Sequence, residues 1–250
     1  MRYALEKITD MVHYGPMFKR FKEHGGVMDV PTLEKIYKPD VILIQGFRKR
    51  VDRWKNLNKT SAPKAVFFSN PHEDLHMRAR QLNQAKIDMS LHHIKNWMNR
   101  YKPLFAPSHK MRWVPFCINP DMFKDYGFER IYDVAILGAM YQRVYPLRTK
   151  IRKTLVGRKD LKIFHRSRPQ PRGDPNTTFM RANYAKAIAR CKMNIFCTSK
   201  FKYAVQKFAE TMGCKTLGMA DVPLDAEELH FRSDYNFVEI NENNFVNKIY

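Results

Sequence analysis

The sequence predicts an α/β fold with two domains, and three features of the chain support this prediction. Short continuous apolar runs bounded by Pro, Asp, Gly or Asn have the length and composition of buried parallel strands. Segments with helical periodicity lie between these runs, which is the order of βαβ units. An extended connector with two prolines, Trp113–Asp121, separates two such series.

Before the connector, two apolar runs are predicted to form strands, Val41–Ile44 and Ala65–Phe68. Two helices are predicted in the same half. Pro31–Tyr37 is a short one, and Pro71–Lys86 is a longer one with Asn70 as its N-cap and proline at its first position.

After the connector, strands and helices alternate again, and the last helix is expected to stop at Gly213. The predicted elements are strand Val134–Leu137, helix Pro146–Leu155, strand Leu161–Phe164, helix Tyr184–Arg190, strand Met193–Cys197 and helix Ala204–Met212. The final residues, Phe245–Tyr250, are expected to be helical, either as a terminal helix or as part of a longer one. We therefore expect two domains, residues 1–114 and 115–250, that face each other across a ligand-binding cleft.

The chain carries an unusually large positive charge. It has 45 Lys and Arg against 24 Asp and Glu, a formal net charge of +21. Both halves share the excess, because 22 basic and 10 acidic residues precede Pro115. The densest stretch, Arg143–Arg172, holds eleven basic residues and one acid, Asp160. Such a field attracts polyanions, namely nucleic acid, an anionic membrane surface or phosphate-bearing substrates, although solvated lysines on a protein of high pI explain it as well.

Other bulk features limit where the protein acts. No run of about 18 apolar residues is present, so no membrane span is expected. The N-terminus lacks the apolar stretch of a signal peptide. The four cysteines form no CxxC pair, which favours reduced, buried thiols in the cytoplasm, or in the host cytoplasm if the protein is viral.

Two segments of the second half have the chemistry of a phosphate or nucleotide site. In DVAILGAMYQRVYPLR, a strand ends at Gly138 and a helix follows, so the backbone and the helix N-terminus can approach a phosphate, with Arg143 and Arg148 as charged partners. In KYAVQKFAETMG, Lys207 and Glu210 are neighbours on one helix face, suited to a phosphate and to ribose hydroxyls. Taken alone, the first segment is equally consistent with an ordinary strand–helix turn, and the second is better explained as an ordinary Lys–Glu surface pair.

Taken together and in order, the segments of the second half resemble a known enzyme family. The segments are VPFCINPDMF, DVAILGAMYQRVYPLR, YAKAIARCKMNIFCTS and KYAVQKFAETMGCKTLGMAD. They are similar to the donor-binding domain of GT-B glycosyltransferases, in the family-1-like group that includes CgeB-type and phage enzymes. The chain departs from that pattern at Cys117 and Ala139, and Glu210 stands where other GT-B groups have a pair of glutamates.

The resemblance implies a GT-B fold of two Rossmann-like domains and a hexosyltransferase-type enzyme. It implies transfer of a sugar from a nucleotide diphosphate sugar, with UDP-sugar favoured, to a hydroxyl. Glu210 would hold the donor ribose, Lys207 and Arg143 would face the diphosphate, and Gly138 would allow close approach. Lys202 and Tyr203 would meet the donor from the preceding loop. No metal or other cofactor is expected, because helix dipole, Lys and Arg can stabilise the leaving diphosphate.

The same resemblance places the acceptor and the catalytic base in the first half. Three residues are candidates for the base: His13, which follows a segment expected to be the first strand, and His72 and Asp74, which follow the strand Ala65–Phe68. Each is also explained as a surface or capping residue. The segment His72–His76 reads HEDLH and formally matches the HExxH zinc motif, so a zinc hydrolase is a remote alternative.

The sequence leaves the acceptor open. The basic field favours double-stranded DNA carrying a modified base, as for a phage-type enzyme, while an anionic polymer, a lipid or a protein is also consistent with it. An alternative of another class is a non-catalytic nucleic-acid-binding protein on a GT-B scaffold.

Overall fold

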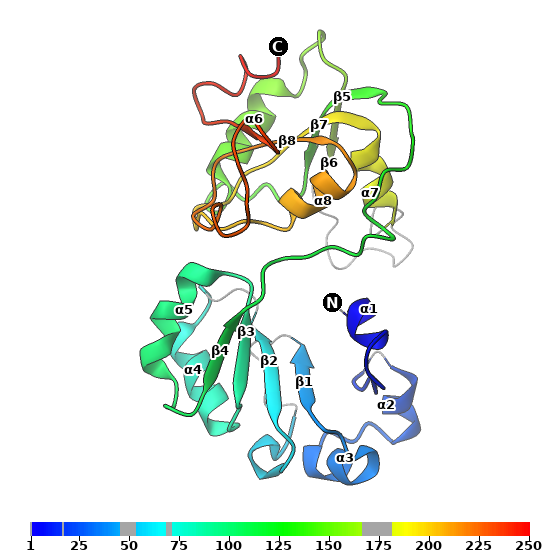
Figure 1. Cartoon of the computed structure of the whole chain (residues 1–250), viewed down its shortest axis with the longest axis vertical. Coiled ribbons are helices and arrows are strands. Elements are labelled where there is room, and N and C mark those ends of the chain that lie inside the picture. Colours follow the sequence, from blue (N-terminus) through cyan, green and yellow to red (C-terminus); the bar gives the residue numbers. More distant parts are fainter. Residues whose placement is uncertain (1, 17, 46–53, 69–71, 167–181) are drawn as a thin grey trace. The chain divides into compact units, whose positions relative to one another are not determined.

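The computed structural model of the protein describes residues 2–16, 18–45, 54–68, 72–166 and 182–250 (Figure 1). The chain forms two compact units, an N-terminal unit of residues 2–115 and a C-terminal unit of residues 116–250. Each unit contains one parallel sheet flanked by helices, which confirms the predicted α/β class. Within the described residues, no helix is both long enough and apolar enough to cross a membrane.

The N-terminal unit is built on a four-stranded parallel sheet in the order β1-β2-β3-β4. The strands are β1 (Ile42–Gln45), β2 (Lys64–Phe68), β3 (Met89–His92) and β4 (Lys110–Trp113). The helices are α1 (Arg2–Glu6), α2 (Lys19–Glu23), α3 (Val30–Tyr37), α4 (Leu75–Gln84) and α5 (Lys95–Tyr101), with short 3-10 turns at Leu57–Lys59 and Lys102–Leu104. Side chains from β2, α4 and α5 form the core of this unit.

Three expectations for this half are corrected by the structure. The segment before His13 that was expected to be a strand contains the helix α1. Helix α4 begins at Leu75 rather than at Pro71, because Asp74 adopts a left-handed conformation (φ 51°) and its carbonyl accepts the first helical bond, from Arg78 N. Asn70 and Pro71, the predicted cap, lie outside the described residues. Strands β3 and β4 were missed, since MSLH and KMRW mix polar and apolar residues.

The C-terminal unit has a five-stranded parallel sheet in the order β6-β5-β7-β8-β9. The strands are β5 (Tyr132–Leu137), β6 (Ile163–Arg166), β7 (Cys191–Ile195), β8 (Leu217–Ala220) and β9 (Val238–Glu239). The helices are α6 (Pro146–Leu155), α7 (Ala182–Ala189) and α8 (Lys207–Gly213). The sequence predicted the bounds of α6 correctly.

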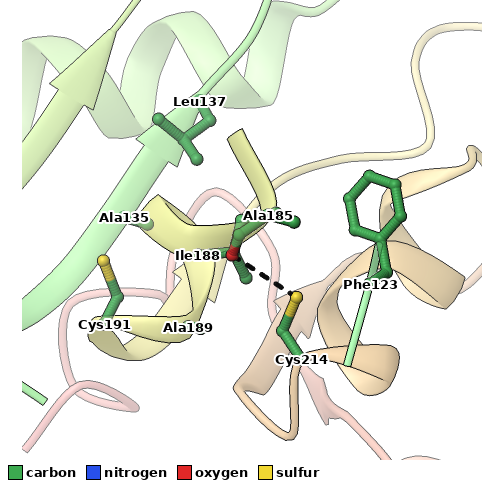
Figure 2. Close-up of a cluster of buried hydrophobic side chains, with 8 residues drawn as sticks. All are labelled: Phe123, Ala135, Leu137, Ala185, Ile188, Ala189, Cys191 and Cys214. Atoms are coloured by element: carbon green, nitrogen blue, oxygen red, sulfur yellow. Dashed lines mark hydrogen bonds between the residues drawn. The ribbon is translucent and has the colours of Figure 1, made fainter. Parts of the chain in front are cut away.

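Strand β5 is buried on both of its faces. Val134 and Ile136 pack with Ile151 and Leu155 of α6, whereas Ala135 and Leu137 pack on the opposite side with residues of α7. Figure 2 shows the second group, in which the Cys214 thiol donates to the Ala185 carbonyl at 3.5 Å. This two-sided burial explains why the strand is a continuous apolar run.

Two expectations for the C-terminal unit are corrected. Helix α8 begins at Lys207 and includes Gly213, so residues 204–206 are not helical. The Ala204 N–H donates to the Asp225 side chain, 2.7 Å away, which ties residue 204 to the loop after β8. The segment Phe245–Tyr250 forms turns instead of a helix, and Phe245 packs into the same core as α6.

The side chains of Ser90 and His92 in β3 and of His109 form a hydrogen-bonded chain in the N-terminal unit. The Ser90 hydroxyl lies 2.7 Å from His92 Nε2 and 2.8 Å from His109 Nε2, and His109 Nδ1 lies 2.8 Å from the Ile87 carbonyl. Since a carbonyl only accepts, His109 carries its proton on Nδ1. Ser90 then donates to His109 Nε2 and accepts from His92 Nε2. Burial lowers the pKa of His92 to about 3 and also lowers the pKa values of His93 and His109.

These histidines are expected to make the N-terminal unit acid-sensitive. The pKa of His92 is about 6.5 when unfolded and about 3 when folded, so its stabilising effect is complete above pH 6.5 and is lost as the pH falls below it. The slope for one such proton is about 1.4 kcal/mol per pH unit. Urea unfolding at several pH values between about 4 and 7.5, on either side of the usual histidine pKa, measures how the free energy of unfolding changes with pH. The substitution His92→Gln is expected to flatten the profile, and His165→Gln, at an exposed position, is expected to leave it unchanged.

Candidate functional site

Loops at the carboxyl ends of three neighbouring strands build the candidate site in the C-terminal unit. Gly138 directly follows β5, residues 196–206 connect β7 to α8, and residues 221–225 follow β8. Strands β5, β7 and β8 are adjacent and parallel, so these loops lie along one edge of the sheet. That edge is where parallel α/β sheets place their ligands.

Gly138 brings the backbone close to two basic side chains. Its φ of +102° is a conformation that side chains with a Cβ rarely adopt. A Cβ at this position would lie 3.1 Å from Lys207 Cε and 3.4 Å from Arg148 Nη1. The absence of a side chain at Gly138 therefore lets Lys207 pack directly against the backbone at the end of β5.

Lys207, Tyr184 and Glu210 form a hydrogen-bonded group that we call the Lys–Tyr–Glu cluster. Lys207 and Glu210 stand one helical turn apart on α8, and Tyr184 comes from α7, which packs against α8 (Figure 1). The Lys207 ammonium donates to the Tyr184 hydroxyl and lies 4.9 Å from the centre of its ring. The Tyr184 hydroxyl in turn donates to Glu210 Oε2 at 3.3 Å.

Burial controls the protonation of this cluster. It lowers the pKa of Lys207 to about 8, although the nearby Glu210 carboxylate opposes the shift. It also raises the pKa of Glu210, against the effect of Lys207 and of the Tyr184 hydrogen bond. The pKa of Tyr184 is raised well above 10 by burial and by Glu210, so the phenol keeps its proton and can donate. The cluster thus presents an ammonium group and a carboxylate that are only partly solvated.

Arg148 and Arg143 occupy different places in the turn between β5 and α6. Arg148 is buried, and its guanidinium donates to the carbonyls of Ala139 (3.0 Å) and Cys197 (3.3 Å), so it fixes the two loops to each other. Arg143 is exposed in that turn. Of the two arginines, the structure brings Arg148 next to Gly138 and uses it to shape the backbone.

The loop before α8 is held by a buried carboxylate. Asp221 accepts from Thr198 N (2.8 Å), from Thr198 Oγ1 (2.6 Å) and from Lys202 Nζ (2.8 Å). Ser199 and Lys202 have positive φ angles of 72° and 54°, which cost conformational energy at non-glycine residues. Tyr203 stacks on Phe116 with ring centres 6.3 Å apart. Lys202 therefore pairs with Asp221, and Tyr203 packs on the connector.

The three candidates for a catalytic base all belong to the N-terminal unit. His13 Nε2 lies 2.6 Å from Glu6 Oε1, and the ring stacks on Phe18. His72 contacts the ring of Trp97 edge-on. Asp74 immediately precedes α4, whereas His76 lies within it. Because His72 precedes the helix, the HEDLH segment does not place its two histidines on consecutive turns of one helix, as the zinc motif requires. Among the described residues, no group of three His, Cys, Asp or Glu is arranged to hold a metal ion.

Solved structures decide the fold family. No protein-family model matches the chain, and no curated protein sequence matches it. Sucrose-phosphate synthase from Thermosynechococcus elongatus superposes with a TM-score of 0.58 at 10% identity, over 94% of this chain and 70% of that one. Anabaena HepE in complex with UDP-glucose gives 0.58 at 11% identity, over 99% and 78%. This chain has the GT-B fold. TarM also matches, with a TM-score of 0.53 at 14% identity, over 87% of this chain and 49% of that one.

Within the GT-B fold, the structure brings together three of the residues singled out from the sequence, Gly138, Lys207 and Glu210. Sequence reasoning missed Tyr184, which stands 23 positions before Lys207 and bonds to both charged residues. The only indication in the sequence was that Tyr184 lies in the helix predicted before the strand Met193–Cys197. No local pattern could show that α7 would present it to α8.

Proposed function

We propose that this GT-B chain is a glycosyltransferase that moves a hexosyl unit from a UDP-sugar to an acceptor hydroxyl. The observation that carries the proposal is the Lys–Tyr–Glu cluster beside Gly138, at the carboxyl ends of β5 and β7. Structures of HepE were solved with UDP-glucose, with UDP and glucose, and with UDP, which supports a UDP-sugar as the donor here.

Each part of the cluster suits one part of such a donor. The ammonium group of Lys207 is a point charge for the diphosphate, and the backbone at Gly138 can approach the same phosphates. The Glu210 carboxylate can accept hydrogen bonds from both ribose hydroxyls. Arg143, Lys202 and Tyr203 are proposed to complete the donor side from the flanking loops.

In the proposed reaction, the bond between the sugar C1 and the diphosphate oxygen breaks and a bond between C1 and the acceptor oxygen forms. The acceptor proton passes to a base, and UDP leaves with the bonding electron pair. Lys207 stabilises the negative charge that develops on the diphosphate, so the proposal requires no metal ion. His13, His72 and Asp74 are the proposed bases, and His13 comes first because the Glu6 carboxylate, 2.6 Å from its Nε2, can orient the ring.

Thermal unfolding against a panel of UDP, GDP, UDP-glucose, UDP-N-acetylglucosamine and zinc tests the donor assignment. A ligand at about one hundred times its Kd stabilises a protein by about 2.7 kcal/mol, which corresponds to a shift of several degrees. We expect the uridine nucleotides to raise the melting temperature and zinc to leave it unchanged. If zinc alone stabilises the chain, the hydrolase alternative replaces this proposal.

For the acceptor, we propose double-stranded DNA with a hydroxyl-bearing base, as for a phage-type enzyme, and we propose that the protein acts in the cytoplasm, or in the host cytoplasm if it is viral. The net charge of +21, spread over both halves of the sequence, supports a polyanionic acceptor. Reaching a base hydroxyl inside a duplex would require the base to be extruded.

DNA binding is expected to depend steeply on salt. If six to ten phosphates are contacted, affinity for duplex DNA should fall by about 10³-fold or more between 50 and 200 mM salt. Fluorescence anisotropy with a labelled duplex measures this fall. Absence of binding at about 50 mM salt would exclude DNA and leave an anionic polymer, a lipid or a protein as the acceptor. Binding of DNA without any stabilisation by nucleotides would instead favour the alternative of a non-catalytic nucleic-acid-binding protein.

A further inference from the structure

Tyr184 occupies an unusual place between the two charged residues of the cluster. Its hydroxyl accepts from the Lys207 ammonium group and donates to Glu210 Oε2, so a single oxygen links a cation and an anion. The rest of the side chain packs against the core formed by Phe123, Leu137, Ala185 and Ile188. The packing of the ring therefore fixes the region in which the hydroxyl can lie.

Lys207 and Glu210 would ordinarily pair with each other directly. They are three residues apart on α8, the spacing at which opposite charges on a helix attract. Among the ion pairs formed by the described residues, Lys207 and Glu210 form none with each other. A direct ion pair would direct the ammonium protons and the carboxylate lone pairs toward each other and away from a ligand.

We propose that Tyr184 is a positioning residue of the donor site, whose hydroxyl keeps Lys207 and Glu210 apart so that each can reach its own part of the nucleotide. This inference rests on the proposed function, because it assigns the diphosphate to Lys207 and the ribose to Glu210. The ammonium group donates one of its three N–H groups to Tyr184, so two remain to bind phosphate oxygens. The carboxylate accepts one bond from Tyr184 and keeps its other lone pairs for the ribose hydroxyls.

The substitution Tyr184→Phe removes one oxygen and keeps the ring in the core. Without the hydroxyl, Lys207 and Glu210 are expected to close into a direct ion pair. A nucleotide must then break this pair before it can bind. We expect the affinity for UDP to fall by about tenfold, which is the free energy of about one charge-assisted hydrogen bond.

A second readout uses the protonation of Lys207, which a purely structural role for Tyr184 would not move. In the wild type, burial holds the pKa of Lys207 at about 8. In the variant, a direct contact with the Glu210 carboxylate favours the charged ammonium, so the titration midpoint should rise. The groups that act on Lys207 are Glu210 on the same helix, Tyr184 on α7, Arg148 on α6 and Cys197 after β7. NMR of 13C-labelled lysine measures the midpoint without any nucleotide.

A matched control is Tyr126→Phe. Tyr126 packs against the same core and donates its hydroxyl proton to the Met122 carbonyl, so this variant also loses one partly buried tyrosine hydrogen bond. We expect it to keep both the wild-type UDP affinity, measured by calorimetry, and the wild-type Lys207 midpoint.

The outcomes separate the inference from the proposed function. If the wild type binds UDP and Tyr184→Phe leaves both affinity and midpoint unchanged, the positioning role is wrong and the proposed function stands. If the wild type does not bind UDP, the proposed function fails, and the positioning role fails with it. If Tyr184→Phe shows a raised titration midpoint of Lys207 and weaker UDP binding, and Tyr126→Phe shows neither, the positioning role and the proposed function are both supported.

Discussion

Replacing Lys207 by methionine is expected to reduce sugar transfer by about 10²- to 10³-fold, the usual cost of removing one group that stabilises a developing negative charge. Methionine keeps the length and the apolar stem of lysine but removes the ammonium group that lies beside Gly138. Because Lys207 is partly buried and its charge carries a desolvation cost, the variant should remain at least as stable as the wild type. The measurement is kcat/KM for UDP-sugar together with the melting temperature.

The same residue predicts a pH dependence for nucleotide binding. The pKa of Lys207 is lowered to about 8, so the ammonium form is present below pH 8 and is lost as the pH rises through that value. Affinity for UDP should therefore fall above pH 8 in the wild type and stay flat across this range in Lys207→Met.

Lys215→Met is the matched control for this experiment. Lys215 lies just after α8, its side chain is 72% exposed, and it pairs with Asp125 at the surface. This variant removes one positive charge from the same unit and is expected to keep full activity. Equal losses in both variants would mean that the overall charge of the unit matters, and not a specific contact at Lys207.

The second large effect is expected from Gly213→Ala, a loss of about 2–3 kcal/mol in the free energy of unfolding of the C-terminal unit. A Cβ at Gly213 would lie 2.5 Å from Ile118 Cδ1 and 2.8 Å from the Phe123 carbonyl oxygen. The Ile118 side chain can rotate away, but the Phe123 carbonyl is backbone and can move only with the segment that carries it. The clash therefore outweighs the gain of about 1 kcal/mol that alanine normally brings inside a helix.

Gly218→Ala provides the control within the same unit. Gly218 lies in β8, and the nearest atoms to an added Cβ, on Phe196 and Thr211, are 3.6 Å away, an ordinary van der Waals distance. We expect this variant to unfold at nearly the wild-type urea concentration. If Gly213→Ala is tolerated as well as Gly218→Ala, the segment around Phe123 does not press on α8 as closely as the structure describes.

Gly213 also illustrates how far a sequence can be interpreted alone. Its position predicted the end of a helix, and the helix does end there, but the need for glycine comes from the close approach of Phe123, which is 90 residues away in the sequence. Continuous apolar runs revealed strands β5 and β7. They missed β3, β4 and β8, whose polar or glycine residues interrupt the pattern.

In the candidate site too, some residues could be predicted from the sequence and others could not. Gly138, Lys207 and Glu210 could be singled out because their strand–turn and helical segments follow one another in the order of the family that the sequence resembles. Tyr184 could not, because its role depends on the packing of α7 on α8. Lys202 was expected at the donor, yet its ammonium group pairs with Asp221, a contact between two loops that no sequence spacing indicates.

A crystal structure of the protein with UDP tests the donor site most directly. We expect the diphosphate within hydrogen-bonding distance of Lys207 Nζ and beside the Gly138 backbone. The ribose hydroxyls should lie on Glu210, with Tyr184 still between the two charged residues. UDP bound away from this cluster, or bound with Lys207 and Glu210 paired to each other, would contradict this expectation.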